Sequence, residues 1–380
     1  MARFDPSVFD APGGSARIRL DARGGGTFDA VVQGDRMRLE PASGDRADAL
    51  LGADVGTWAS MAEDYQGGMD AYSTGALLVR RNLHLAIGFL TATSGSTEPG
   101  RLKMGRVETP MGSLATLEAG TGDPLVMLHG LGATKASFVP TIAALASEER
   151  RMIAVDLPGF GDSVKPLGAR YHAPFFARSV VGLLDALELD RPDVLGHSMG
   201  GRVAIDMGIR HPDRVARLVL MTPALAWRRS RRWAPWVKLL RPELGLIQPT
   251  NRRAVEAVVR RLVPGAENAW VAAAVDEFLR SFLTPRGRAA FYAAARQIYL
   301  EEPDGPRGFW ARLAEMSPDA LFIWGKRDTL VPIGFARHVE GVLPAAKHVE
   351  LACGHVPQLE RPKELHAAIE KFLRGRAKPV

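Results

Sequence analysis

Residues 193–201 read DVLGHSMGG, and the segment GHSMG at 196–200 matches the pattern G-x-S-x-G. That pattern is informative at a sharp turn between a strand and a helix. Here an apolar stub precedes it, and a stretch able to start a helix follows it. A nucleophilic serine at such a turn has strained dihedral angles and leaves no space for Cβ atoms beside it, a requirement that Gly196 and Gly200 meet. The stretch predicts a reactive Ser198 at a helix start, where N–H groups face developing negative charge.

The chain around this turn alternates strands and helices from residue 104 to residue 380. Strands are expected at residues 125–128, 152–155, 194–195, 218–221, 321–324 and 348–351, after a hairpin over residues 105–118. Helices are expected at residues 138–145, 175–187 and 362–373. This alternation is typical of an α/β fold with a doubly wound, mostly parallel sheet. Between about residues 224 and 318 only helical patterns occur, at residues 252–262, 269–282 and 288–298. They predict a helical cap that controls access and excludes water.

Two polar residues follow expected strands of this sheet. Asp328 comes after the strand at 321–324, and His355 comes after the strand at 348–351. Because the carboxyl ends of parallel strands meet at one edge of a sheet, both side chains are expected near Ser198. Acyl transfer by serine needs a base that takes the hydroxyl proton and an anion that orients this base. We therefore predict Ser198 as nucleophile, His355 as base and Asp328 as orienting acid, with no metal and no cofactor.

Several motifs occur in a fixed order along this part of the chain: HG at 129–130, DLPGFGDS at 156–163, GHSMGG at 196–201, WGKRD at 324–328 and GHVPQLERP at 354–362. In these motifs the chain from residue 103 onward resembles α/β-hydrolases of the epoxide-hydrolase-like and lipase/esterase branch. The resemblance implies an oxyanion hole formed by the backbone N–H groups of Leu131 and Met199. Its supporting residues are His129, Gly130, Gly196 and Gly200.

The identity of the nucleophile narrows the chemistry that the resemblance implies. Epoxide hydrolases and haloalkane dehalogenases of this fold carry aspartate at the turn, whereas Ser198 implies attack on a carbonyl carbon. Serine followed by Met-Gly-Gly is also similar to meta-cleavage C–C hydrolases and perhydrolases. Ester hydrolysis is therefore favoured, and C–C cleavage stays open.

Residues 1–93 have a different pattern. Alternation at residues 16–21, 27–32 and 37–41 indicates a meander of strands, and helical patterns at 55–61, 68–73 and 83–90 follow, with a strand at 75–80. This order predicts a small α+β domain. Residues 49–58 and 72–83 resemble the sterol-carrier-protein type 2 lipid-binding domain, although Arg81-Asn82 stands where that family usually has Gly-Asp. The resemblance implies a tunnel for acyl chains or sterols; a folded appendage with a filled core is the alternative. Residues 94–103 are predicted to be a linker, because they are small and polar and include glycine and proline, which interrupt helices and strands.

Composition excludes several other classes of protein. The 380 residues are 46% hydrophobic and 24% charged, which suits a globular chain of one large domain or two. The N-terminus lacks the apolar segment of a secretory signal, and no run approaches the ~18 apolar residues of a membrane span. The single cysteine, Cys353, excludes internal disulfides and is expected to be buried and structural. A cytoplasmic location is the expectation.

The net charge of +7 is concentrated between residues 227 and 263. The basic residues there are Arg228, Arg229, Arg231, Arg232, Lys238, Arg241, Arg252, Arg253, Arg260 and Arg261. Trp227, Trp233 and Trp236 are interleaved with them. One interpretation is a solvated helical face, and the other is peripheral contact between the cap and an anionic membrane. No nucleic-acid recognition module accompanies the basic run, so nucleic acid is not an expected partner.

The predicted function is a serine hydrolase that cleaves the carboxylic ester of a small molecule or lipid through an acyl-enzyme. The alternatives are C–C hydrolysis or acyl transfer with the same residues, and a lipid-binding protein whose hydrolase fold is not catalytic. The remaining polar residues near the motifs are expected to be structural. His197 is expected to pack away from the site, Asp156 to fix a turn, and Asp162 and Ser163 to cap a turn near the entrance.

Overall fold

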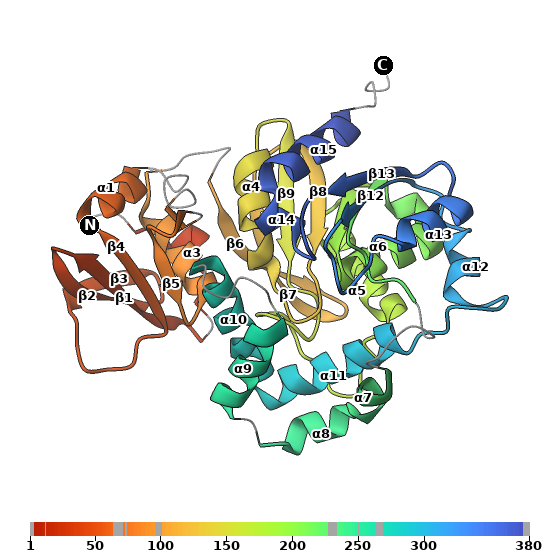
Figure 1. Ribbon diagram of the computed structural model, residues 1–380. Coiled ribbons are helices and arrows are strands. Elements are labelled where there is room, and N and C mark those ends of the chain that lie inside the picture. The colour runs from red at the N-terminus through yellow and green to blue at the C-terminus, as the bar shows by residue number, and fades with distance from the viewer. Residues whose placement is uncertain are drawn as a thin grey trace.

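The computed structural model describes residues 4–11, 13–63, 71–72, 74–95, 101–226, 234–249, 251–262 and 269–374. Figure 1 shows a small sheet with its helices, a large sheet between helices, and a further group of helices below. We call these parts the N-terminal domain, the core and the cap. The cap consists of the helices between β11 (Arg217–Met221) and β12 (Asp319–Gly325). This arrangement confirms the predicted α/β fold class with a helical cap and a small α+β domain before it.

The N-terminal domain contains a five-stranded sheet of order β3-β2-β1-β4-β5. Its strands are β1 (Ser15–Arg23), β2 (Gly26–Gln33), β3 (Arg36–Pro41), β4 (Ala49–Asp54) and β5 (Leu78–Arg80). The helices α1 (Val55–Glu63) and α3 (Leu83–Thr93) pack on one face of this sheet. The short 3-10 helix η1 (Pro6–Val8) precedes the first strand in the chain and contacts α3. Alternation along β1 buries Ile18 and Leu20, while Arg17 and Arg19 lie on the opposite face and both pair with Asp29.

The expected meander of three strands is confirmed, since β1 pairs with β2 and β2 pairs with β3, both antiparallel, but the strand β4 was not expected. Strand β4 lies beside β1 and runs parallel to it, with Leu20 opposite Leu51. Both residues are buried, so this pairing extends one apolar face across the two strands. The helix predicted at 83–90 is confirmed as α3, whereas the helix predicted at 68–73 lies mostly outside the described residues.

Helix α3 joins the N-terminal domain to the core. Asn82 caps it by accepting the N–H of Leu85 at 3.0 Å. The helix is apolar on nearly every side because it is buried on nearly every side, between its own sheet and β6 (Lys103–Thr109) of the core. A Cβ atom on Gly88 would lie 2.8 Å from the sulfur of Met104 in β6, so the helix approaches this edge strand closely.

The core sheet has eight strands in the order β13-β12-β11-β10-β8-β9-β7-β6. The strands not yet placed are β7 (Gly112–Ala119), β8 (Asp123–Leu128), β9 (Arg150–Val155), β10 (Asp193–His197) and β13 (Lys347–Leu351). Strands β6 and β7 form the predicted antiparallel hairpin at one edge, and β8 to β13 run parallel. Val126 and Val219 are fully buried, since helices cover both faces of the sheet.

Every strand and helix expected in the core is confirmed. The helices are α4 (Val139–Leu145), α5 (Ala173–Ala186), α6 (Met199–Arg210), α13 (Phe335–Val342), α14 (Pro357–Glu360) and α15 (Pro362–Arg374), with the 3-10 helices η2 (Lys135–Phe138) and η3 (Pro212–Arg214). The loops at the carboxyl ends of the parallel strands carry the residues of interest, as the topology requires.

The cap consists of α7 (Ala234–Leu239), α8 (Pro242–Ile247), α9 (Arg252–Leu262), α10 (Ala269–Phe282), α11 (Pro285–Tyr299) and α12 (Phe309–Leu313). The helices expected at 252–262, 269–282 and 288–298 are confirmed as α9, α10 and α11. Helices α7 and α8 are too short to show a period in the sequence. Trp227, Trp233 and the arginines between them lie outside the described residues. Within the described ranges, no helix is long and apolar enough to span a membrane.

Candidate active site

Ser198 lies at the sharp turn between β10 and α6. Its φ is 52° and its ψ is −112°, a conformation that strains any residue with a side chain. The turn is also crowded. A Cβ atom on Gly196 would lie 2.4 Å from the carbonyl oxygen of Gly200, and one on Gly200 would lie 2.0 Å from the carbonyl oxygen of Leu128. Both positions therefore require glycine, and the turn holds the serine hydroxyl away from its own backbone.

The structure brings Ser198, His355 and Asp328 together although they are distant in the sequence. Nε2 of His355 lies 3.0 Å from Oγ of Ser198, and Nδ1 of His355 lies 2.8 Å from Oδ2 of Asp328. The other carboxylate oxygen of Asp328 accepts the N–H groups of Leu330 and Val331 at 2.7 and 2.9 Å. The buried acid is therefore fixed in one orientation, and it can fix the tautomer and orientation of the imidazole.

Leu131 and Met199 belong to two segments that meet at this serine. Met199 is the first residue of α6, so its N–H has no acceptor within the helix. The loop with Leu131 lies against the turn, since a Cβ atom on Gly130 would be 3.3 Å from Cβ of Ser198. Neither N–H donates to a protein acceptor among the residues that the structure describes. Two free donors beside a serine hydroxyl suit an oxygen that becomes negatively charged.

His129 supports this loop through hydrogen bonds. Its Nε2 accepts the N–H of Leu157 at 3.0 Å, so the ring proton is on Nδ1, which donates to the carbonyl oxygen of Gly130 at 2.8 Å. Burial lowers the pKa of His129, which keeps the ring neutral. The role of His129 is therefore structural, and it holds Gly130 against the turn.

Asp156 fixes the neighbouring turn, as expected. Its carboxylate accepts the backbone N–H of Lys135 at 2.7 Å, the ammonium of Lys135 at 2.6 Å and the N–H of Asp162 at 2.9 Å. Burial by itself would lower the pKa of Lys135, but Asp156 and Asp162 outweigh burial and raise it. The hydroxyl of Ser163 donates to the carbonyl oxygen of Asp156 and accepts the N–H of Ala115.

His197 does not pack away from the site, and that expectation is wrong. Its Nε2 donates to the carbonyl oxygen of His355 at 2.8 Å, and the two rings are 5.1 Å apart. The hydroxyl of Thr222 donates to the same carbonyl at 3.1 Å. Burial lowers the pKa of His197 to about 3, so the ring is neutral. Both residues hold the backbone of the base; nothing in the sequence indicated Thr222.

Aromatic side chains of the cap cover the oxyanion loop. A Cβ atom on Gly132 would lie 2.7 Å from the ring of Phe278 and 3.1 Å from the ring of Phe291. Phe278 stacks on Phe282 at 5.0 Å and meets Phe291 edge-on at 5.6 Å. We call Phe278, Phe282 and Phe291 the aromatic roof. The spacing of Phe278 and Phe282 by one helical turn was visible in the sequence, but their position over Gly132 was not.

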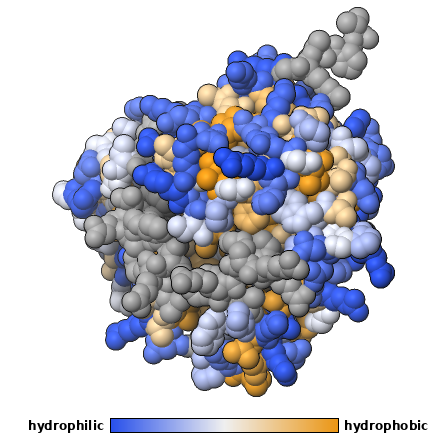
Figure 2. Space-filling view, turned by 45° about the vertical axis from the view of Figure 1, so that its right-hand side comes forward, coloured by the Kyte–Doolittle hydropathy of each residue, from blue (hydrophilic) through white to orange (hydrophobic). Residues whose placement is uncertain are grey.

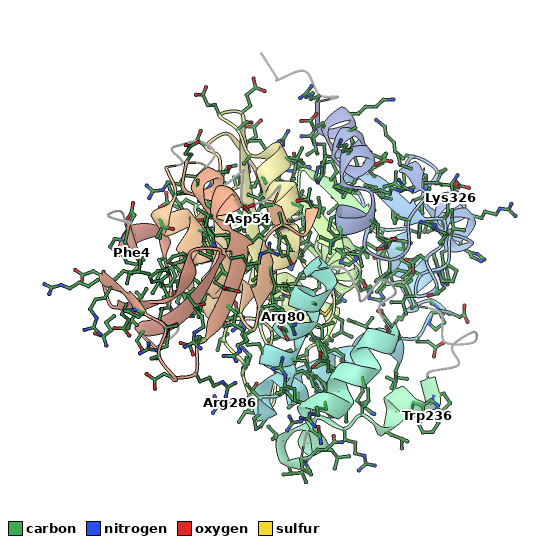
Figure 3. The ribbon with its side chains drawn as sticks, turned by 60° about the vertical axis from the view of Figure 1, so that its left-hand side comes forward. Phe4, Asp54, Arg80, Trp236, Arg286 and Lys326 are labelled. Carbon is green, nitrogen blue, oxygen red and sulfur yellow. The ribbon has the colours of Figure 1, made fainter. Side chains whose placement is uncertain are left out.

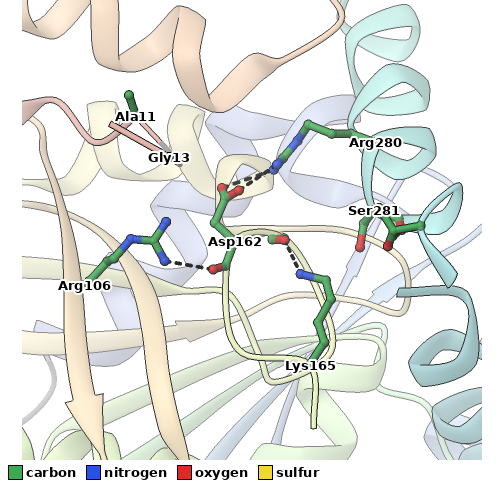
Figure 4. A pocket seen from close by; sticks show the side chains of 9 residues that line it. Ala11, Gly13, Arg106, Asp162, Lys165, Arg280 and Ser281 are labelled. Atoms are coloured by element: carbon green, nitrogen blue, oxygen red, sulfur yellow. Dashed lines mark hydrogen bonds and ion pairs between the residues drawn. The ribbon is translucent and has the colours of Figure 1, made fainter. Parts of the chain in front are cut away.

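The helix that carries the roof is bound to the core by a buried ionic cluster. Arg280 of α10 pairs with Asp162 at 2.6 Å and with Glu277 at 2.5 Å, and Asp162 pairs with Lys135 at 3.2 Å. Burial by itself would raise the pKa of Asp162, but the surrounding cations hold it well below its usual range. Figure 4 shows Asp162 and Arg280 of this cluster at a cavity of about 460 Å³ between the N-terminal segment, the core and the cap, where Arg106 donates to the carbonyl oxygen of Asp162. Asp162 thus connects parts of the protein rather than only capping a turn.

The N-terminal domain also binds helix α10. Asp276 of α10 accepts Nε of Arg80 at 2.7 Å, the backbone N–H of Arg81 at 2.8 Å and the guanidinium of Arg252 at 2.6 Å. Figure 3 shows Arg80 beside α10. Nδ1 of His84 in α3 lies 3.4 Å from Oδ2 of Asp162. Helix α10 therefore contacts the N-terminal domain through its charged residues and the oxyanion loop through Phe278.

Cys353 is buried, as expected, and burial raises its pKa to about 11, so it is not poised as a thiolate. In the described part of the chain, no group of three or more His, Cys, Asp or Glu side chains could hold a metal ion.

A family model matches most of the core and the cap. The model described as the alpha/beta hydrolase fold covers residues 123–362. Among curated proteins, the chain is 30% identical over 272 residues to 2-hydroxymuconate semialdehyde hydrolase of Pseudomonas sp. (strain CF600), which covers 67% of this chain and 88% of that protein.

Solved structures give the same fold. A hydrolase from Pseudomonas aeruginosa PA01 matches with a TM-score of 0.59 and 25% identity, over 72% of this chain and 98% of its own. A bacterial membrane phospholipase A matches with a TM-score of 0.55 and 25% identity, over 72% of this chain and 86% of its own. The chain therefore belongs to the alpha/beta hydrolase fold family and is an enzyme of that superfamily.

Proposed function

We propose that the protein is a serine hydrolase that cleaves carboxylic esters of apolar or lipid acyl groups. One observation carries the proposal: hydrogen bonds join Ser198 through His355 to Asp328, and the N–H groups of Leu131 and Met199 in the adjoining segments donate to no acceptor among the described residues. These residues would supply the nucleophile, the base, the orienting acid and the oxyanion donors.

The reaction follows from this geometry. Nε2 of His355 takes the proton of Ser198 as its oxygen attacks the ester carbonyl, and the N–H groups of Leu131 and Met199 stabilise the resulting oxyanion. The tetrahedral intermediate expels the alcohol, which receives the proton from His355, and leaves Ser198 acylated. Water then attacks the acyl group with His355 again as base, which releases the acid and restores the serine. Asp328 holds the imidazole and stabilises its charged form.

The surroundings of the site favour a neutral, apolar substrate. The aromatic roof covers the oxyanion loop, so a bound acyl chain would contact aromatic rings. Arg280, two residues from Phe278, and Lys135, three residues after Gly132 in the oxyanion loop, are both paired with carboxylates. Neither cation is free to bind a carboxylate of the substrate, so the site favours an uncharged ester as substrate. The 25% identical phospholipase A acts on esters by its name, which agrees with this substrate class.

C–C bond hydrolysis is the second candidate, and a specific observation favours it. The 30% identical relative is by its name a hydrolase of 2-hydroxymuconate semialdehyde, which has a carboxylate and an aldehyde, and the same residues could attack the aldehyde carbonyl. Such an anion needs a cationic partner in the site, and Lys135 and Arg280 are already paired with carboxylates. Acyl transfer to an alcohol in place of water would use the same acyl-enzyme.

Parallel turnover assays separate these candidates. The protein and its Ser198→Ala variant would be given p-nitrophenyl esters from acetate to palmitate and, separately, 2-hydroxymuconate semialdehyde. We expect Ser198-dependent ester cleavage with kcat/KM rising toward longer acyl chains. Turnover of the semialdehyde with slow ester cleavage would establish the C–C hydrolase instead. Formation of an alkyl ester when an alcohol is added would identify an acyltransferase.

The lipid-carrier resemblance of the N-terminal domain is a proposal of its own. It rests on the resemblance at residues 49–58 and 72–83, while the packing of α3 on β1, β4, β6 and α10 agrees with the alternative of a filled core. After the serine is blocked with a fluorophosphonate, a fluorescent fatty acid would bind the full chain if the domain holds lipid. If the fatty acid does not bind, the remaining role of the domain is to support the cap. Lipid binding by a parent protein that turns over no ester would favour the non-catalytic binding protein.

A further inference from the structure

The outer side of the cap exposes apolar side chains of two consecutive short helices. Trp236 and Leu239 on α7 are 67% and 65% exposed, and Ile247 on α8 is 77% exposed. Leu244 and Leu246 on α8 are also exposed. We call Trp236, Leu239, Leu244, Leu246 and Ile247 the apolar face. Figure 3 shows Trp236 at the outer edge of the cap, and Figure 2 shows hydrophobic residues at the lower edge of the molecule, bordered by hydrophilic ones.

The packing of these helices accounts for the exposure. Helix α8 lies directly on α11, since a Cβ atom on Gly245 would be 2.8 Å from the backbone of Ala289. Helix α7 buries Val237, whose carbonyl oxygen accepts from Arg296 of α11. Each helix has therefore already used one side for contact with α11. The apolar face lies on the remaining side, where solubility alone would favour polar residues.

Basic residues adjoin the apolar face. Lys238 and Arg241 lie within the same two-helix segment, against one acid, Glu243, and Arg253 is exposed on the next helix, α9. None of these three cations has an ion-pair partner among the described side chains, in contrast to Arg252, which pairs with Asp276 at 2.6 Å. A second copy of this chain would bring a like-charged surface against it. An anionic surface is the complementary partner.

We propose that the apolar face and its flanking cations dock the protein on an anionic lipid bilayer. Trp236, Leu239 and Ile247 would enter the boundary between headgroups and acyl chains, and Lys238, Arg241 and Arg253 would lie at the level of the phosphates. Tryptophan is suited to this boundary because its ring is apolar and its N–H is polar. The inference rests on the surface and not on the proposed ester cleavage, so either can fail without the other.

The position of the face gives docking a consequence for the site. Helix α11 contacts α8 through Ala289 and contributes Phe291 to the aromatic roof, so one helix separates the bilayer surface from the oxyanion loop. A docked protein would present its cap to lipid, and the substrates nearest to it would be acyl esters.

Vesicle binding of the full-length Ser198→Ala protein tests docking without hydrolysis of the vesicles. Phosphatidylcholine vesicles with and without about one quarter phosphatidylglycerol would be sedimented with the protein. We expect a strong preference for the anionic vesicles. We also expect brominated acyl chains to quench the tryptophan fluorescence of the protein, and Trp236→Phe to remove this quenching. Trp236→Ser/Leu239→Ser/Ile247→Ser should reduce the partition coefficient at least tenfold. The control Leu39→Ser/Leu167→Ser, which alters exposed leucines elsewhere, should not.

A charge variant tests the second half of the proposal. Each basic residue near an anionic bilayer contributes about fivefold to partitioning, so Lys238→Glu/Arg241→Glu should weaken binding more than tenfold. Arg36→Glu/Arg38→Glu, on the exposed strand β3, is the matched control. Equal binding to neutral and anionic vesicles, or equal binding by the variants and their controls, would overturn the proposal. A dimer in size-exclusion chromatography that the triple variant dissociates would show instead that the face joins two copies.

Discussion

Asp276→Asn tests whether the N-terminal domain holds the cap over the site. The carboxylate of Asp276 is 2% exposed and binds Arg80, the N–H of Arg81 and Arg252. Breaking a fully buried pair costs about 3–5 kcal/mol, but Arg80 and Arg252 are 34% and 44% exposed and can regain water. Asparagine also keeps an acceptor for Arg81. We therefore expect a loss of about 2 kcal/mol, located where α10 meets β5.

This loss should appear as local opening of the cap. A loss of about 2 kcal/mol raises the population of an opened α10 about thirtyfold, and its amide hydrogens should exchange faster by that factor. Exchange in β10 and β11 should stay unchanged. Because Phe278 is two residues from Asp276, KM for long-chain esters should rise while kcat for the acetate ester changes little.

Glu40→Gln is the matched control, since it removes a carboxylate that pairs with Arg17 inside the N-terminal domain, away from the cap. It should leave α10 exchange unchanged. Unchanged exchange of α10 in Asp276→Asn, or equal acceleration throughout the chain, would refute the idea that this contact positions the cap.

Three further changes test the site. Asp328→Asn should lower kcat about 10⁴-fold by favouring the wrong tautomer of His355, measured by steady-state kinetics; a loss below tenfold would contradict its role. Phe278→Ala should raise KM for long-chain esters about tenfold but leave the acetate ester nearly unaffected; equal effects on both would exclude a role in acyl binding. The pKa of His197 is about 3 in the folded protein and near 6.5 in the unfolded chain. The neutral ring therefore contributes its full share of the free energy of unfolding above about pH 6.5, and this contribution declines as the pH falls below that value. The free energy of unfolding in urea should fall by about 2 kcal/mol more in the parent than in His197→Gln between about pH 8 and about pH 5; identical slopes would contradict a neutral His197.

The core fold was predictable because short stretches of sequence specify each of its strands and the turn at Ser198. Apolar runs specify buried strands, glycines 196 and 200 specify the turn, and Asp328 and His355 follow strand ends whose meeting point the topology dictates. The distances among Ser198, His355 and Asp328 then follow from the fold.

Contacts between distant segments were not predictable in this way. Asp276 shows no pattern that pairs it with Arg80, and the position of Phe278 over Gly132 depends on how the cap docks. The strand β4 was not predicted, and its parallel position beside β1 depends on the burial of a shared face rather than on a turn. His197 was misjudged because the residue before the nucleophile also faces the backbone of His355.

The central claim is that Ser198 is the activated nucleophile. Reaction of the protein with a fluorophosphonate, followed by peptide mass spectrometry, measures this directly. We expect one modified peptide, containing Ser198, with labelling abolished in Ser198→Ala and strongly slowed in Asp328→Asn. Absence of labelling in the parent, or labelling that persists in Ser198→Ala, would contradict the account.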